Sequence, residues 1–175
     1  HELATRDGLT GLYNHRHFFD HLSAVMAHGR LHGLSTAVIM ADLDAGPDRG
    51  LKAVNDSLGH LAGDELLRQV GAALRGLVRH DDLVARYGGD EFAIVAADTD
   101  AAPAQALARR VVEGLRGRVF AVQGTEARVT ASVGVAVAHP ARDADASSVV
   151  NRADRGLYRA KERGGDQFCF VPGEG

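Results

Sequence analysis

The sequence predicts an α/β (α+β) fold in which helices flank a mixed sheet. Segments with apolar residues at helical spacing alternate with short apolar runs that are typical of strands. Two of those runs are joined by Gly88-Gly89-Asp90, a hairpin signal. The 175 residues are 45% hydrophobic and 25% charged, with a net charge of −3. This composition is typical of a globular domain, and it excludes a disordered chain and a generic polybasic nucleic-acid binder.

Four segments carry the helical pattern. The first begins near His15, where Phe18, Leu22 and Met26 recur every three or four residues, and Gly33 closes the turn that follows. The others are rich in leucine, valine and alanine on one face. The predicted helices are residues 15–29, 62–79, a segment around 107–115, and 146–163.

The predicted strands lie between these helices. Residues 35–43 form an apolar run that predicts a buried strand, and residues 129–138 contain alternating valines. Residues 45–50 predict a loop because they contain Gly, Pro and Asp. The remaining predicted strands are residues 83–87, 91–97, 119–122 and 167–171.

The chain contains no internal repeat and no linker, so we expect a single domain over residues 1–175. Residues 1–6 are expected to be the end of an upstream linker helix. No apolar run is long enough to span a bilayer. Cys169 is the only cysteine, which excludes an intramolecular disulfide and favours a reducing compartment.

Acidic residues occur where predicted strands end or begin. Asp42 and Asp44 close the first strand, and Asp90 and Glu91 lie at the tip of the Gly-Gly hairpin. If these strands are neighbours, the carboxylates converge at one edge of the sheet. Clustered carboxylates suit Mg²⁺, which keeps its other positions for water or phosphate. The alternative is a solvated hairpin tip, because Gly-Gly-Asp is also good turn chemistry.

Two further pairs allow a functional and a structural interpretation. Asn55 and Asp64 carry an amide and a carboxylate, which together can bind a guanine edge, but Asp64 can equally stabilise a helix N-terminus. Arg79 and Asp82 are three residues apart, just before the hairpin. They can bind phosphate and guanine, or form a salt bridge at a helix end.

The segment Arg86-Tyr87-Gly88-Gly89-Asp90-Glu91-Phe92 resembles the signature of GGDEF domains, the diguanylate cyclase family. Other segments resemble further motifs of this family in the same order along the chain. They are Asp7 to Phe18, Asp42-Leu43-Asp44, Asn55-Asp56, Gly59-His60, Gly63-Asp64, Ala131 to Ala136 and Ala153 to Lys161. The similarity extends from Asp7 to Phe170.

This resemblance implies a palm-like fold with a mainly antiparallel sheet, similar to adenylate cyclase catalytic domains. It implies an enzyme that condenses two GTP molecules into cyclic di-GMP with release of two pyrophosphates, acting as a homodimer. Mg²⁺ or Mn²⁺ would be bound by Asp42, the Leu43 carbonyl and Asp90, with Glu91 as a further catalytic residue. Other roles implied by the resemblance are guanine binding by Asn55 and Asp64, phosphate binding by Lys52 and Lys161, and product inhibition through Arg79, Asp82 and Arg110.

The sequence departs from the family pattern near the expected phosphates. Residues 45–50 are inserted after Asp44, and Gly165 stands where the family commonly has an arginine. Arg49, within the insertion, is a candidate replacement cation. These departures leave an alternative function: a weak or inactive domain that serves as a receptor for GTP or cyclic di-GMP. We expect a cytoplasmic location, with upstream regions that can be membrane-attached, and no contact of this domain with nucleic acid or membrane.

Overall fold

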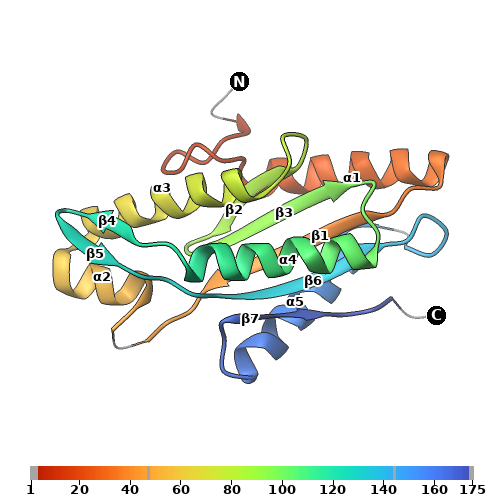
Figure 1. Ribbon diagram of the computed structural model, residues 1–175. Coiled ribbons are helices and arrows are strands. Elements are labelled where there is room, and N and C mark those ends of the chain that lie inside the picture. Colours follow the sequence, from red (N-terminus) through yellow and green to blue (C-terminus); the bar gives the residue numbers. More distant parts are fainter. Residues whose placement is uncertain (1–3, 47, 144, 174–175) are drawn as a thin grey trace.

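The computed structural model describes residues 4–46, 48–143 and 145–173 (Figure 1). Its elements alternate along the chain much as the apolar periodicity predicts. In order they are α1 (His15–His32), β1 (Thr36–Leu43), α2 (Gly50–Leu58), α3 (His60–Leu77), β2 (Leu83–Gly88), β3 (Glu91–Ala97), α4 (Ala101–Arg116), β4 (Phe120–Val122), β5 (Thr125–Ala127), β6 (Ala131–Ala138), α5 (Ala146–Glu162) and β7 (Gln167–Phe170). No described helix is long and apolar enough to cross a membrane.

The main sheet has five strands in the order β2-β3-β1-β6-β7. All neighbouring strands are antiparallel except β6 and β7, which are parallel and connected by α5. In the central register, Asp42 at the end of β1 lies opposite Glu91 at the start of β3 and Ser132 near the start of β6. The predicted fold class, a mixed and mainly antiparallel sheet flanked by helices, is confirmed.

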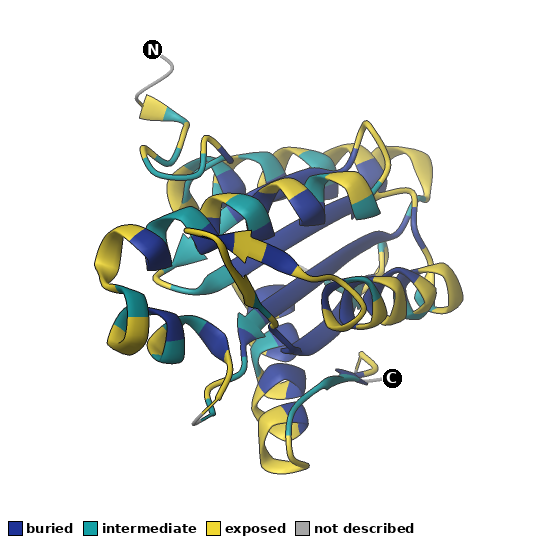
Figure 2. Cartoon of the chain, turned by 60° about the vertical axis from the view of Figure 1, so that its left-hand side comes forward, coloured by how far each residue is buried: buried dark blue, intermediate teal, exposed yellow. Residues whose placement is uncertain are grey.

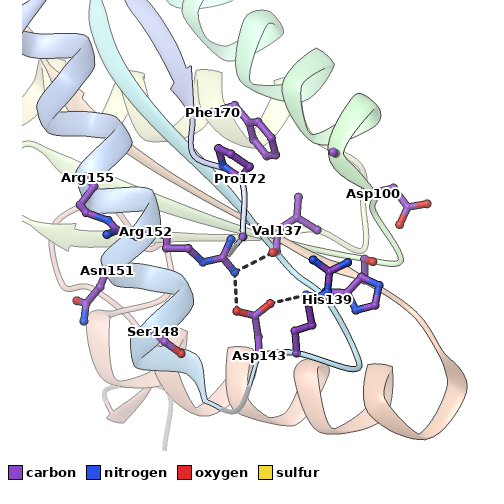
Figure 3. A pocket seen from close by; sticks show the side chains of 14 residues that line it. Asp100, Val137, His139, Asp143, Ser148, Asn151, Arg152, Arg155, Phe170 and Pro172 are labelled. Atoms are coloured by element: carbon purple, nitrogen blue, oxygen red, sulfur yellow. Dashed lines mark hydrogen bonds and ion pairs between the residues drawn. The ribbon is translucent and has the colours of Figure 1, made fainter. Parts of the chain in front are cut away.

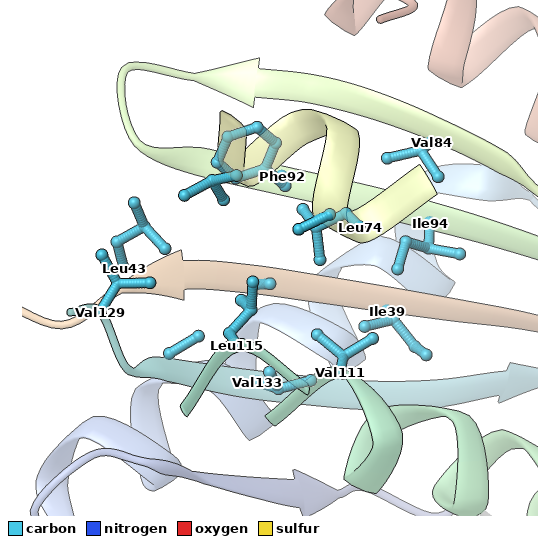
Figure 4. Packing of buried hydrophobic residues seen from close by; sticks show 14 of the residues in the cluster. Ile39, Leu43, Leu74, Val84, Phe92, Ile94, Val111, Leu115, Val129 and Val133 are labelled. Atoms are coloured by element: carbon cyan, nitrogen blue, oxygen red, sulfur yellow. The ribbon is translucent and has the colours of Figure 1, made fainter. Parts of the chain in front are cut away.

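Each face of the sheet packs against its own pair of helices. Because side chains alternate along a strand, Ile39 of β1 points toward α3 and α4, whereas Val38 and Met40 point toward α1 and α5. Figure 4 shows the first of these cores, in which Leu74 and Leu115 pack on the sheet. The strands are buried between helices whose outer surfaces are exposed (Figure 2). This burial on both faces explains the nearly continuous apolar character of β1 and β6.

Two elements were not expected from the sequence. Helix α2 occupies residues that follow the predicted loop, and Leu51 and Val54 pack it onto the α3 side of the core. The segment is only nine residues long and contains Asn, Asp and Ser, which are poor helix formers, so its stability comes from packing. Strand β5, three residues long, pairs only with β4.

The N-terminal segment differs from the expected helix end. Residues 1–3 lie outside the described part of the chain. Within the remainder, Arg6 forms an antiparallel bridge with Tyr13, so residues 4–6 do not continue an α-helix. Helix α1 begins only after Asn14, whose side chain accepts a hydrogen bond of 2.9 Å from the His17 amide.

Candidate functional site

Acidic side chains from two adjacent strands meet at one end of the sheet. The β2–β3 turn carries Asp90 back toward the end of β1, where the Leu43 amide donates a 3.2 Å hydrogen bond to the Asp90 carbonyl. This backbone contact sets the side chains of Asp42 and Asp90 beside each other. Both line a cavity of about 420 Å³, together with Leu43, Lys161 and Arg49. The structure therefore brings together the three residues that the sequence suggested as metal ligands.

Several carboxyl groups lie close together at this end of the sheet, so it is electrostatically unfavourable for all of them to be ionised at once. Burial and the neighbouring Asp42 carboxylate raise the pKa of Asp90 to about 6. Burial, followed by the charges of Asp42 and Asp154, also raises the pKa of Glu91. Like charges in a partly buried site disfavour ionisation, so this cluster favours the arrival of a cation.

Lys161 supplies one positive charge to the carboxylates. It extends from the last turn of α5, and its ammonium group forms an ion pair with Asp42. Burial lowers the pKa of Lys161, but the hydrogen bond to Asp42 and the charges of Asp42, Glu91 and Asp90 outweigh burial and raise it. Lys161 therefore remains protonated at neutral pH and offers a fixed cation at the cavity.

The residues present fit a hard divalent cation that shares its coordination with substrate or water. Among the described residues, no three acidic, histidine or cysteine side chains gather closely enough to form a complete metal site. Asp42, Asp90 and the Leu43 carbonyl provide a partial oxygen set at one cavity. Mg²⁺ is commonly held in this way, by one or two carboxylates with water and phosphate oxygens completing the shell.

The carboxylate of Asp44 has a structural role, because it links neighbouring segments of the chain. Asp42, in contrast, is a candidate metal ligand. Its carboxylate accepts hydrogen bonds from the Thr130 hydroxyl at 2.7 Å, the Ser132 hydroxyl at 2.6 Å and the Asp166 amide at 2.9 Å. An ideal Cβ on Gly165 would lie only 2.8 Å from an Asp44 carboxylate oxygen. Asp44 therefore ties the Gly164–Gly165 turn to the sheet, and this turn forms one wall of the cavity.

Asn55 and Asp64 lie at the junction of α2 and α3. Gly59, with φ of 91°, separates the two helices and lets the chain turn between them. The Asn55 Oδ1 atom is buried and has no hydrogen-bond partner among the described residues. A Cβ on Gly63 would collide with that atom, so the glycine makes room for the amide. An unsatisfied buried amide oxygen is the feature expected where a polar ligand completes the hydrogen bonding.

The two lysines occupy different environments. Lys52 is 77% exposed and forms a surface ion pair with Asp56 at 2.7 Å, one turn along α2. It does not line the cavity, whereas Arg49, just before α2, does. The loop that contains Arg49 is closed by a bridge between Gly46 and Arg49. The insertion thus adds a cation to the cavity that Gly165 also lines.

Arg79 and Asp82 form a salt bridge at a helix end, which is the structural one of the two interpretations that the sequence allowed for this pair. The Arg79 Nη2 atom lies 3.2 Å from the buried Asp82 carboxylate and also donates to the Ala97 carbonyl and the Thr99 hydroxyl. Arg110 reaches the same helix end from α4, where its Nε donates a 2.7 Å hydrogen bond to the Leu77 carbonyl. The two arginines and Asp82 are therefore grouped at the C-terminal end of α3, away from the carboxylate cavity.

Asp154 is a further acidic residue near the site, and its place there was not expected from the sequence. Burial raises its pKa, and its charge contributes to the raised pKa values of Glu91 and Tyr87. Asp154 belongs to α5, two turns before Lys161. Its position in a motif was visible in the sequence, but its proximity to Glu91 depends on how α5 packs on the sheet.

This chain is similar to known proteins over most of its length. Residues 4–167 match the family described as "Diguanylate cyclase, GGDEF domain". The chain is 37% identical to cyclic di-GMP phosphodiesterase PdeR of Escherichia coli, over 97% of this chain and 24% of PdeR. It is 32% identical to diguanylate cyclase A of Treponema denticola, over 93% of this chain and 43% of that protein. The chain thus spans less than half the length of these relatives.

The fold also matches solved structures. The crystal structure of the GGDEF domain of DgcB from Caulobacter crescentus, in complex with c-di-GMP, aligns with a TM-score of 0.84 and 28% identity. The alignment covers 98% of this chain and 94% of that one. With the family match extending over almost the whole sequence and the same fold in three dimensions, the chain belongs to the GGDEF family of diguanylate cyclase domains.

Proposed function

We propose that this chain is a diguanylate cyclase that condenses two GTP molecules into cyclic di-GMP. The observation that carries the proposal is the convergence of Asp42, Asp90 and the Leu43 carbonyl with Arg49 and Lys161 around one cavity. Three acidic and two basic side chains line this cavity, so its net charge is 2 − 3 = −1. A triphosphate binds there only when further positive charge accompanies it, which makes the activity dependent on a divalent cation.

Each residue contributes a distinct function to the reaction. Asp42, Asp90 and the Leu43 carbonyl would hold Mg²⁺ or Mn²⁺, and the bound ion would neutralise charge on the attacking and leaving oxygens. Glu91, whose pKa is raised by burial and by the charges of Asp42 and Asp154, accepts the proton of the attacking 3′-hydroxyl. Lys161 and Arg49 bind the outer phosphates. Asn55 and Asp64 form the guanine subsite, where the unsatisfied Asn55 amide gains its partner.

The reaction requires two copies of the domain. Each copy binds one GTP, and the 3′-hydroxyl oxygen of each nucleotide forms a bond to the α-phosphorus of the other. The bond from that phosphorus to pyrophosphate breaks, and the hydroxyl proton passes to the base. The product is a cyclic dinucleotide with two new phosphodiester bonds, so a homodimer is the active species.

A receptor function is the second candidate, and specific features of the cavity favour it. Gly165 contributes no cation to the phosphate end, and Lys161 is engaged with Asp42. A domain with these features can retain guanine recognition while turnover is slow. In that case the protein binds GTP or cyclic di-GMP and transmits the bound state to a partner.

The two candidates are separated by incubating the chain with GTP and Mg²⁺ and resolving the nucleotides by chromatography. The cyclase produces cyclic di-GMP and two equivalents of pyrophosphate, and Asp90→Asn abolishes both products. Asp20→Asn, an exposed carboxylate change on α1, serves as the matched control and keeps full activity. Saturable GTP binding without product identifies the receptor instead.

Protein concentration provides a second test of the two-copy reaction. If two domains meet for each turnover, the rate rises faster than linearly with protein concentration until the dimer is saturated. A strictly linear dependence, with no dimer detected by sedimentation, contradicts the two-copy reaction.

A further inference from the structure

A second and larger cavity lies at the opposite end of the sheet from the carboxylates. Its volume is about 1090 Å³, slightly above the range of roughly 300–1,000 Å³ that is typical of small-molecule sites. Ser35 precedes β1, Val137 belongs to the end of β6, and Phe170 ends β7, so the cavity lies at the end of the sheet where β1 begins and where β6 and β7 finish (Figure 3). Helix α5 forms one wall and the start of α4, near Asp100, forms another.

Arg152 extends from α5 into this region and is almost completely buried, with 6% of its surface exposed. Its Nη2 atom donates to the Val137 carbonyl at 2.9 Å and to the Asp143 carboxylate at 2.6 Å (Figure 3). Its Nη1 atom is buried and has no hydrogen-bond partner within the described part of the chain. A buried guanidinium nitrogen without an acceptor is energetically unfavourable, and an incoming anion can relieve that cost.

The charge around Arg152 also favours an anion. The second oxygen of Asp143 is already engaged, because it accepts a 2.7 Å hydrogen bond from the His139 amide. Arg142 and Arg155 line the cavity as well, and both are exposed to solvent. With Asp100 and Asp143 as the acidic residues, the lining carries three arginines against two aspartates, a net charge of 3 − 2 = +1.

Part of the wall is apolar. Val137 of β6, Phe170 of β7 and Pro172, just after β7, contribute hydrocarbon and aromatic surface (Figure 3). Flat rings pack well on such surfaces, and arginine guanidinium groups bind carboxylates and phosphates through paired hydrogen bonds. The cavity thus combines one surface for a ring with several donors for an acid group.

We propose that this cavity binds a small organic anion, whose carboxylate or phosphate meets the arginines and whose flat apolar ring lies against Phe170, Pro172 and Val137. The site is separate from the carboxylate cavity, because it is lined by Val137, whose β1 partner Ala37 lies at the start of that strand, whereas the carboxylate cavity is lined by Asp42 and Leu43 at the end of β1. Anion binding at this cavity therefore does not depend on whether the chain synthesises cyclic di-GMP.

The test uses benzoate and phenyl phosphate as probes, with benzyl alcohol as the neutral analogue, and follows backbone amide signals by NMR titration. At least one anion shifts the amides of Val137, His139 and Asn151 saturably, and benzyl alcohol binds about tenfold more weakly or not at all. Binding of phenyl phosphate alone assigns a phosphate ligand, and binding of benzoate alone assigns a carboxylate ligand.

Variants locate the binding. Arg152→Gln can unfold the protein, because it leaves Asp143 without its partner in a buried site. Arg142→Gln and Arg155→Gln change exposed residues and preserve the fold. Each is expected to weaken anion binding roughly threefold or more. Arg159→Gln, one turn beyond Arg155 on α5 and outside the cavity, is the matched control and keeps the affinity.

Three results overturn the proposal. The first is the absence of saturable shifts with either anion. The second is equal affinity for benzyl alcohol, which removes the requirement for charge. The third is an equal loss of affinity in Arg159→Gln and Arg155→Gln. That result would mean that the overall positive charge of α5, and not a specific site, attracts the anion.

Discussion

Lys161, on α5, forms an ion pair with Asp42, at the end of β1, although 119 residues separate them in the sequence. The pair places a protonated amine beside carboxylates that include Asp90, whose pKa is about 6. The cluster is therefore only partly neutralised, and its charge state depends on pH and on added cations.

The stability of the metal-free protein should fall as pH rises from about 4 to above about 6. In that range the native state retains a proton on Asp90 that the unfolded chain has lost, because the folded pKa is raised from its usual value of 3.8. For this half-buried group we expect a decrease of about 1–2 kcal/mol in the free energy of unfolding, after solvent screening. Urea unfolding at a series of pH values measures it.

Asp90→Asn removes this titration and should flatten the pH dependence in that window. The variant should be more stable than the parent protein at about pH 8, where the parent carries an ionised Asp90. Asp20→Asn, exposed on α1, should keep the parental profile. An unchanged profile in Asp90→Asn would assign the pH dependence to other groups.

Mg²⁺ should stabilise the protein more at about pH 8 than at about pH 5, because the ligand must be deprotonated to bind the ion. Thermal unfolding with and without MgCl₂ at the two pH values measures the difference. Asp90→Asn should lose most of the Mg²⁺-induced shift in melting temperature. A shift that is equal at both pH values, or that survives in Asp90→Asn, would count against Asp90 as a ligand.

Gly63→Ala should displace the Asn55 side chain, since the added methyl group would overlap Asn55 Oδ1. We expect affinity for both GTP and GMP to fall about tenfold, because both nucleotides carry the guanine that Asn55 is proposed to bind. Isothermal titration calorimetry measures both affinities. Gly76→Ala is the control on the same helix: nothing lies within 4 Å of its added Cβ, so it should stabilise α3 by about 0.5–1 kcal/mol and leave binding unchanged.

Arg49→Ala should weaken GTP binding about three- to tenfold and leave GMP binding unchanged, because GMP lacks the outer phosphates. Lys52→Ala removes a cation of the same charge from α2, but Lys52 pairs with Asp56 and does not line the cavity. It should therefore have little effect on either nucleotide. The opposite pattern, in which Lys52→Ala weakens GTP binding and Arg49→Ala does not, would assign the phosphate contact to Lys52.

Arg79→Ala should weaken binding of cyclic di-GMP about tenfold and relieve product inhibition, while GTP turnover at low product is retained. It should also cost stability, because the buried Asp82 carboxylate keeps only the hydrogen bond from the Arg79 amide. Arg110→Ala should weaken product binding too. Arg109→Ala, on the same helix but positioned over Phe168, is the control. A loss of stability without a loss of affinity would limit Arg79 to the salt bridge.

Several features of this protein were predictable from the sequence because they depend on local chemistry. The periodicity of Phe18, Leu22 and Met26 predicts α1, and the valines of residues 129–138 predict β6, since burial on one face requires regular spacing. Gly88 and Gly89 predict the turn between β2 and β3, which are paired as expected. The family motifs, read in order, predicted the fold class and identified Asp42, Leu43 and Asp90 as neighbours.

Tertiary structure decided which distant residues meet. The pairing of β1 with both β3 and β6 results from packing between two helical layers, and it brings Asp42 beside Asp90 and Ser132 beside Asp44. The same packing places Lys161 at the carboxylates, Lys52 away from them and Arg152 in a second cavity. Local periodicity carries no information about these contacts, because each depends on the register and orientation of elements that are far apart in the chain. The sequence by itself therefore determined most of the elements, the family and most of the candidate residues, whereas only the packed fold added α2 and β5 and decided which side chains share a cavity.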